Sequence, residues 1–429
     1  MIIKIKSILF TVLAVLLILS AAAGCTTSGT LSVSQAAPSQ TVGISNDSQN
    51  RPSATPVSQA VPESNNSSET PSAAQADPSQ EIIFDDEYLE FAIRRQLGIQ
   101  NRPVTIADTQ GVTELDLGSQ TIMNISALKH FKDLESLDLA FNRISDISVL
   151  SGLVNLSDLN LYGNKISDIS ALSGLVKLAN LDLHENQIGD TSALSGLVNL
   201  INLNLSNNQI SDISALSGLL NLTCLDSDFN QISDISVLSE LTNLTHLSFI
   251  YNQIGDISAL SGLANLESLT LSNNQISDIS ALSGLVKLAY LDLSCNYRIG
   301  DISALSGHVK LTYLDLAANQ ISNISALSGF VNLTHLNLEV NQISDISVLS
   351  GFVNLIFLEL AGNQISDIGA LSGLVNLETL HIFDNQISDI AALSSLVNLT
   401  NLHLSGNPIE NYDPIKKIYE QLVYKDFHM

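Results

Sequence analysis

A carboxylate and two imidazoles recur at one fixed interval near the C-terminal end of this 429-residue sequence. Glu359, His381 and His403 follow one another at steps of 22 residues. If each step returns the chain to the same place on a neighbouring strand, the three side chains form one column at a spacing of about 4.8 Å, where they could approach Zn²⁺. Two histidines and one acid also arise easily by chance on a large repetitive surface. We therefore predict no metal site and no cofactor.

A row of aspartates has the same spacing. It suggests a calcium hypothesis, because Ca²⁺ prefers carboxylate oxygens as ligands. The alternative is that each aspartate caps the short turn "D-I-S-A-L" by accepting a backbone N–H. Two units carry Asn124 and Asn323 instead, and asparagine can cap without a charge, so we favour capping. The eleven aspartates are Asp146, Asp168, Asp190, Asp212, Asp234, Asp256, Asp278, Asp301, Asp345, Asp367 and Asp389.

These residues belong to a repeated unit that must position them. Asparagine recurs every 22 residues, with one step of 23 after Asn296, in the unit L-x-x-L-x-L-x-x-N-x-I-S-D-I-S-A-L-S-G-L-V-N. The "L-x-L" alternation predicts a short strand with its leucines inward, and the asparagine can satisfy backbone groups in the turn that follows. More than a dozen copies indicate an α/β solenoid of the leucine-rich-repeat type. We predict a right-handed curved array with a parallel β-sheet on the concave face, short helical or 3-10 turns on the convex face, and helical caps at both ends.

Composition and charge exclude several classes of function. Hydrophobic residues make up 45% of the chain but aromatic residues only 5%, with no Trp, which suits a thin aliphatic core. The formal net charge of −26 repels nucleic acid, so we predict no nucleic-acid partner. The sequence contains no P-loop, no G-x-S-x-G, no H-E-x-x-H and no paired-cysteine metal motif, and we predict that the protein is not an enzyme.

The N-terminus predicts export and anchoring. Lys4 and Lys6 precede an uncharged, mostly apolar run of 17 residues that ends in small residues, as in a secretory signal. The sequence "AAGC" resembles a bacterial lipobox, which makes Cys25 the predicted lipid attachment site and the membrane a partner through that lipid. The alternative is an uncleaved transmembrane helix, for which 17 residues is short. Both interpretations place the rest of the chain outside the cytoplasmic membrane, at the cell surface.

The remaining segments read as a linker and two caps. Residues 26–80 are rich in Ser, Thr, Pro and Gln without an apolar period, which predicts a disordered tether. Leu89, Ile93 and Leu97 fall at helical spacing after an acidic turn, and Pro414 begins a second apolar stripe near the C-terminus. The predicted boundaries are 1–25 for the signal, 26–80 for the linker, 81–111 for the N-terminal helical cap, 112–407 for about 14 repeats of 22 residues, and 408–429 for the C-terminal helical cap.

The cap and the repeat together resemble one family. The sequence "IFDDEYLEFAIRRQLGI…VTIADTQGVTELDL", followed by 22-residue "NQISDISAL" units, is similar to the internalins, which are bacterial surface proteins with a helical cap and a curved leucine-rich-repeat domain. The resemblance covers roughly Ile82 to Ile409. It implies a protein-binding scaffold whose concave face holds a partner. Better-known members continue into an immunoglobulin-like domain and a wall-sorting signal, whereas here we expect a short cap and an N-terminal lipid, so the resemblance extends to surface display and protein binding only.

The binding residues are predicted at the variable positions of the repeat, which lie among the strand leucines and before the asparagine. In the first half of the array these positions are acidic and amide-rich, and in the second half they gather aromatic residues, which are typical of binding hot spots. We predict a monomer that binds a protein ligand through this face. The alternative is a structural or adhesive spacer, which has no need of an aromatic cluster. The predicted contact residues are His246, Tyr251, Tyr290, Tyr313, His335, Phe357, Glu359, His381, Phe383 and His403.

One unit breaks the core pattern. In "LDSDFNQIS", Ser227 takes the place of the second strand leucine. A polar group then faces inward unless Phe229 changes the local packing, so we expect a local soft spot in the array.

Overall fold

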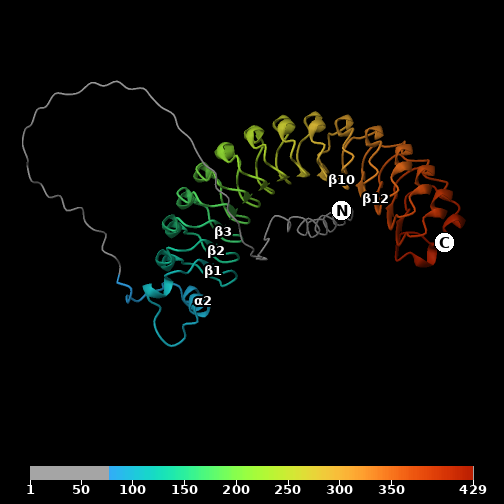
Figure 1. The fold of residues 1–429 in the computed structure, drawn as a ribbon. Coiled ribbons are helices and arrows are strands. Elements are labelled where there is room, and N and C mark those ends of the chain that lie inside the picture. The colour runs from blue at the N-terminus through green and yellow to red at the C-terminus, as the bar shows by residue number, and fades with distance from the viewer. Residues whose placement is uncertain (1–76, 429) are drawn as a thin grey trace, which may run out of the picture. The chain divides into compact units, whose positions relative to one another are not determined.

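Residues from Pro78 onward wind into a curved coil of short repeated segments (Figure 1). The computed structural model describes residues 77–428. Figure 1 shows strands along the inner side of an arc and short helical turns along its outer side. The predicted signal, Cys25 and nearly all of the linker lie outside the described residues. Within residues 77–428, no helix has both the length and the apolar character needed to cross a membrane.

Within the described part of the chain, fifteen strands form a single parallel sheet in which every strand pairs with its neighbours in sequence. The register places equivalent residues of successive repeats side by side, as Leu159 opposite Leu181. The predicted parallel sheet is therefore confirmed. The strands are β1 (Glu114–Asp116), β2 (Ser136–Asp138), β3 (Asp158–Asn160), β4 (Asn180–Asp182), β5 (Asn202–Asn204), β6 (Cys224–Asp226), β7 (His246–Ser248), β8 (Ser268–Thr270), β9 (Tyr290–Asp292), β10 (Tyr313–Asp315), β11 (His335–Asn337), β12 (Phe357–Glu359), β13 (Thr379–His381), β14 (Asn401–His403) and β15 (Tyr424–Lys425).

A 3-10 turn lies on the outer path of each repeat, and the recurring aspartate caps it. Asp256 Oδ1 accepts a hydrogen bond from the backbone N–H of Ser258 at 2.8 Å. All eleven aspartates and the two replacing asparagines make this bond, which confirms the capping prediction. The turns are η2 (Ser126–His130), η3 (Ser148–Gly152), η4 (Ser170–Leu172), η5 (Ser192–Leu194), η6 (Ser214–Gly218), η7 (Ser236–Glu240), η8 (Ser258–Gly262), η9 (Ser280–Gly284), η10 (Ser303–Leu305), η11 (Ser325–Leu327), η12 (Ser347–Gly351), η13 (Gly369–Gly373) and η14 (Ala391–Ser395).

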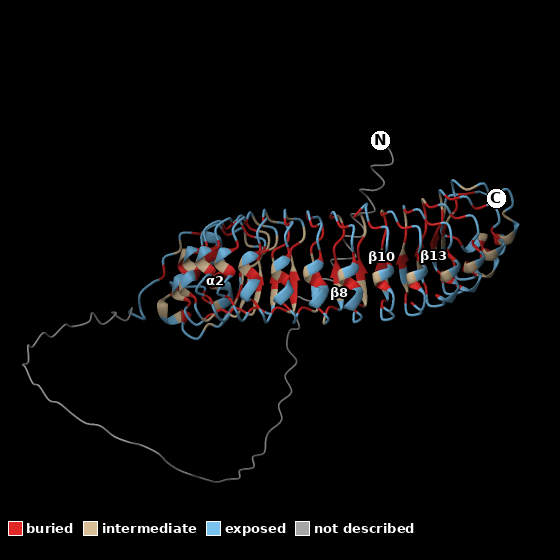
Figure 2. Ribbon diagram, turned by 90° about the horizontal axis from the view of Figure 1, so that it is seen from above, coloured by how far each residue is buried: buried red, intermediate tan, exposed pale blue. Residues whose placement is uncertain are grey.

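The core is a continuous stack of leucine and isoleucine side chains, and Figure 2 shows buried residues recurring in every coil. The repeat asparagine lines this core. Asn274 Nδ2 donates to the carbonyl oxygens of Phe249 (2.7 Å) and Leu271 (3.1 Å), and its Oδ1 accepts from the N–H of Ile254 at 3.0 Å. One amide thus satisfies backbone groups of two adjacent repeats that water does not reach.

Ser227 is the polar residue in this core that the sequence predicted. Its side chain is 0% exposed, and Oγ has no hydrogen-bond partner among the described residues. The strand ladder continues past it, because Ser227 N–H still donates to the carbonyl of Ser248 at 2.8 Å. Phe249 occupies the equivalent position of the next repeat and is fully buried. A larger side chain beside a smaller one keeps the core filled while the hydroxyl stays unsatisfied.

The residue before each repeat asparagine has a left-handed backbone conformation. Its φ lies between 51° at Phe229 and 72° at Gly406. The chain must turn sharply there to leave the strand and direct the asparagine inward. The single 23-residue step adds Tyr297 just after Asn296, also at positive φ, and leaves the β9–β10 register intact. The extra residue is therefore absorbed outside the strand.

The N-terminal cap is an α-helix, α2 (Glu87–Leu97), followed by a 3-10 turn, η1 (Ile106–Thr109). Asp86 caps α2 by accepting the N–H groups of Tyr88 and Leu89, both at 3.0 Å. Its second oxygen accepts the N–H groups of Met123 (2.7 Å) and Asn124 (3.0 Å), so one carboxylate joins the cap to the first repeat. Burial opposes the charge of Asp86, but these four bonds outweigh it and lower its pKa.

The C-terminal end differs from the continuous helix that its apolar stripe indicated. It forms two 3-10 turns, η15 (Asp413–Ile415) and η16 (Tyr419–Gln421), and then strand β15, which pairs with β14. Ile415 and Ile418 are still buried, since a spacing of three residues suits a 3-10 turn as well as an α-helix. The last strand covers the open edge of the sheet, which a helix could not do by backbone pairing.

Candidate functional site

The concave face is built by residues that alternate with the buried strand leucines. In strands β1 to β14 the central leucine is buried, and its two neighbours point to the open side. Since the strands are parallel and in register, each outward position forms a column that runs across the sheet. The sequence therefore controls the composition of each column one residue at a time.

One column carries a ladder of aromatic rings. Tyr290 and Tyr313 stack with ring centroids 4.2 Å apart and planes inclined by 6°. The His335 ring lies 6.0 Å from that of Tyr313 and 5.9 Å from that of Phe357. Phe357 meets the His381 ring of the neighbouring column edge-on at 6.2 Å, and Phe383, which lies outside both columns, has its ring centroid 6.5 Å from that of His403. The predicted second-half cluster is thus a continuous surface over strands β9 to β14.

The neighbouring column contains the acid and two histidines considered above as a zinc site. Glu359, His381 and His403 are in register, and Glu359 Oε2 lies 2.6 Å from His381 Nδ1. The rings of His381 and His403 stack at 4.4 Å, so their faces meet and their nitrogens do not converge on one point. Glu359 and His381 are each 4% exposed, and therefore serve as the floor of the ladder. Burial opposes the charge on His381, but the bond to Glu359 outweighs it and raises the pKa of His381.

Half-buried carboxylates continue this floor through the rest of the sheet. Burial, reinforced by Asp228 and Asp182, raises the pKa of Asp226 to about 7. Burial likewise raises the pKa of Asp182 to about 6, and that of Glu339 to about 7 with a contribution from Glu359. Asp292 and Asp315 lie in register on β9 and β10, where burial raises both pKa values.

Two predicted contact residues lie apart from the ladder. His246 is exposed on β7, and Ser268 on β8 separates it from Tyr290. Tyr251 belongs to another aromatic group, where it stacks on Phe229 at 4.8 Å and 16°. The sequence pointed to Phe229 only for its packing beside Ser227, so it is not among the predicted contact residues. The sequence feature that could have indicated Phe229 as a contact residue is its position directly before the repeat asparagine. The backbone is left-handed there, and a bulky residue is unexpected.

A further aromatic group lies near the N-terminal end of the face. Phe141 and Tyr162 have centroids 4.3 Å apart, and Tyr162 and His184 have centroids 4.6 Å apart. Gly163 makes this arrangement possible, because a Cβ at that position would meet the Phe141 ring at 3.1 Å. The concave face therefore carries three aromatic groups, of which the sequence singled out the one on β9 to β14.

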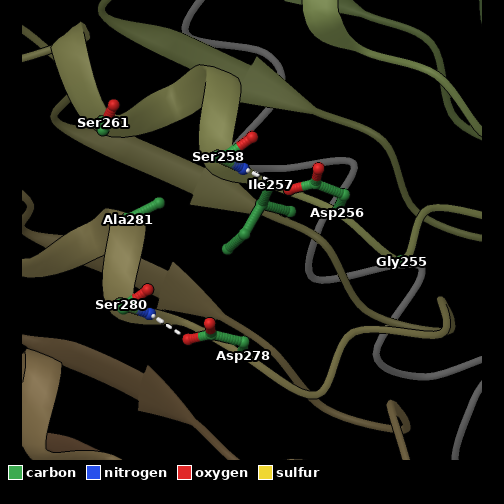
Figure 3. A pocket seen from close by; sticks show the side chains of 8 residues that line it. All are labelled: Gly255, Asp256, Ile257, Ser258, Ser261, Asp278, Ser280 and Ala281. Carbon is green, nitrogen blue, oxygen red and sulfur yellow. Dashed lines mark hydrogen bonds between the residues drawn. The ribbon is translucent and has the colours of Figure 1, made fainter.

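Grooves lie between adjacent turns on the convex side. The groove in Figure 3, of about 530 Å³, lies between η8 and η9 and is lined by Asp256, Ser258, Asp278 and Ser280. Dashed lines in Figure 3 mark the bonds by which both carboxylates cap the turns. A similar groove recurs beside Asp168. Among residues 77–428, no group of three or more His, Cys, Asp or Glu side chains is placed to hold a metal ion.

Comparison with known proteins agrees with this architecture. Family profiles described as leucine-rich repeats match residues 134–188, 198–240, 264–307, 309–351, 353–395 and 375–417. No curated protein sequence matches the chain. The fold and the profiles define a leucine-rich-repeat protein.

Solved structures identify the family within that class. An internalin, InlF, from Listeria monocytogenes shares 34% identity with a TM-score of 0.68, over 82% of this chain and 98% of that one. The chain thus belongs to the internalin family. The functional domain of InlJ from the same organism has 23% identity and a TM-score of 0.71, over 80% of this chain and 74% of that one, and shows the same fold. The ectodomain of the Arabidopsis receptor kinase GASSHO1/SCHENGEN3, solved with CASPARIAN STRIP INTEGRITY FACTOR 2, has 26% identity and a TM-score of 0.63, over 71% of this chain and 40% of that one.

Proposed function

We propose that the protein is a surface scaffold that binds a protein ligand through its concave face. The observation that carries this proposal is the ladder of Tyr290, Tyr313, His335 and Phe357 on four consecutive strands. Large rings supply contact area at little cost in side-chain entropy, and they dominate binding energy where they cluster. A protein whose only role was to provide reach would have no use for such a surface. That the plant receptor GASSHO1/SCHENGEN3 was solved with a protein factor is consistent with binding by this fold.

The remaining functional assignments follow from this role. We propose that the protein acts as a monomer, without enzymatic activity, outside the cytoplasmic membrane. Lipid attached at Cys25 would hold it there, and residues 26–80 would act as the tether. The alternative function is a structural or adhesive spacer of the cell envelope.

The test uses the compact unit, residues 78–429, immobilised and exposed to cell-envelope and host-surface protein extracts. A captured protein is identified by mass spectrometry, purified and measured by biolayer interferometry. Replacing Tyr313, Phe357 and Phe383 by Ala should weaken binding at least thirtyfold, which corresponds to about 2 kcal/mol.

The matched control replaces three exposed apolar residues that lie away from the concave strands. Phe91→Ala on α2, with Val286→Ala and Val353→Ala on the return loops, removes similar surface. This variant should keep full affinity. If the ladder variant binds as tightly as the unmodified protein, or if both variants lose affinity equally, the concave ladder is not the binding site and the spacer function is favoured.

A further inference from the structure

Phe229 and Tyr251 form an exposed aromatic pair, called here the rim pair, at the edge where the strands end. Their rings stack at 4.8 Å, yet the two residues remain 43% and 39% exposed. Both have a left-handed backbone, with φ of 51° and 53°. They lie on adjacent repeats, so the pair presents one apolar surface beside the concave face.

The backbone at this position disfavours such residues. In the left-handed region a Cβ approaches the following carbonyl oxygen, so glycine and asparagine are the residues that fit. The chain places Gly163, Asn207 and Asn273 there in other repeats, but also Phe141 and Val340. The backbone conformation is therefore common to all repeats. The rim pair differs in that two exposed aromatic residues occupy this position on adjacent repeats and stack on each other, although neither fills the core.

The charges beside the rim pair define what it can bind. Asp226 and Asp228 precede Phe229 on the same repeat, and both are partly exposed. Asp228 Oδ1 accepts bonds from Ser248 Oγ (2.5 Å) and from the N–H of Ile250 (2.7 Å), while Oδ2 accepts none from the described residues. From β1 to β14, neither the strands nor the residues that lead from each strand to its repeat asparagine include a Lys or an Arg. Asp226 and Asp228 therefore have no lysine or arginine beside them in these segments of the described chain.

We propose that the rim pair binds arginine side chains of a basic segment of the partner. Because the two rings face each other, a guanidinium can stack on the outer face of one of them while its N–H groups donate to Asp228. Lysine does this less well, because its ammonium is compact and strongly hydrated and does not stack as a plane. This inference rests on the proposed function, since it specifies the chemistry of the ligand at one part of the concave face.

The experiment measures binding of fluorescein-labelled octa-arginine and octa-lysine to the full-length protein by fluorescence anisotropy. A salt concentration of about 150 mM screens general attraction to the acidic surface beyond about 8 Å. The rim variant carries Phe229→Asn and Tyr251→Asn. Its affinity for octa-arginine should fall about tenfold, whereas its affinity for octa-lysine should change by less than about twofold. Its thermal midpoint should not fall, because asparagine tolerates the left-handed backbone.

Ala318→Asn is the matched control, because Ala318 has the same backbone conformation (φ 53°) away from the rim pair. It should bind both peptides like the unmodified protein. Asp228→Asn, which keeps both rings, should weaken octa-arginine binding severalfold and tests the carboxylate separately. Unchanged octa-arginine affinity in the rim variant, equal loss for both peptides, or equal loss in the Ala318 control overturns the proposal. If the proposal is overturned in this way but the variant with Tyr313, Phe357 and Phe383 replaced by Ala still loses its protein partner, the proposed function stands without this inference.

Discussion

Mild acid should stabilise this protein, and Asp226→Asn should reproduce part of that effect at neutral pH. The folded structure raises the pKa of Asp226 from 3.8 to about 7 through burial and neighbouring carboxylates. Between these two values the folded state binds more protons than the unfolded state, so stability falls as pH rises from about 4 to about 7. Asp182, Asp228 and Glu339 act in the same direction.

The magnitude follows from the shift. A rise of about three units corresponds to roughly 4 kcal/mol if all of it opposes folding at high pH. Water reaches part of the Asp226 carboxyl and screens its charge, so we expect about 1 to 2 kcal/mol. No bond to the Asp226 side chain contributes to its pKa shift, so asparagine loses no such bond. Asp226→Asn should therefore raise the free energy of unfolding by about 1 to 2 kcal/mol at pH 7.5 and by less than half of that at pH 5, where the unfolded chain already ionises this side chain.

The assay is urea denaturation followed by far-UV circular dichroism at pH 5.0 and pH 7.5. Asp212→Asn is the matched control: it removes the same charge from the convex edge, where the bond to Ser214 N–H lowers the pKa of Asp212. That variant should show no comparable gain at pH 7.5. The reasoning fails if the unmodified protein becomes more stable from pH 5 to pH 7.5, or if the two variants gain equally.

Three further predictions concern the repeat itself. Asn274→Ala should lower the free energy of unfolding by about 3 kcal/mol, measured by urea denaturation, because buried backbone groups of two repeats lose their partner; an effect below about 1 kcal/mol would contradict the ladder. Ser227→Ala should raise the same quantity by about 1 kcal/mol, since it removes a buried unsatisfied hydroxyl; a loss of stability would show that Oγ has a partner. Asp278→Ala should lower the thermal midpoint, measured by scanning calorimetry, by less than Asn274→Ala does. Asp278→Asn should keep the midpoint of the unmodified protein, because asparagine also caps the turn. A lower midpoint in the asparagine variant would favour a role that needs the charge.

The repeat was predictable because each of its recurring residues has a local structural role. The leucines at alternate positions must face inward, and the asparagine and aspartate side chains satisfy backbone groups a few residues or one repeat away. These partners can be located from the repeated sequence alone, because each lies at a fixed number of residues from the asparagine or aspartate that bonds to it. The C-terminal cap was less predictable, because Ile415 and Ile418 suit either kind of helix and the open edge of β14 decided the outcome.

The candidate site was predictable as a set of columns but not as a set of contacts. The period put Glu359 beside His381, yet it did not show that both are buried or that the His403 ring stacks face to face on that of His381. The sequence indicated Phe229 only as a packing residue beside Ser227, because the period does not show that its ring stacks on that of Tyr251. Its neighbours in the column, such as Asn207, show the backbone requirement only after the turn is seen.

The sequence by itself determined the solenoid, the parallel sheet, the capped outer turns and the residues available to the concave face, because these depend on interactions that repeat with the chain. Only the tertiary structure decided which outward rings touch, how far each acid is buried and where the backbone is strained. The physical reason is that these properties arise between repeats, where the register and curvature of packed coils set distances that no single 22-residue unit contains.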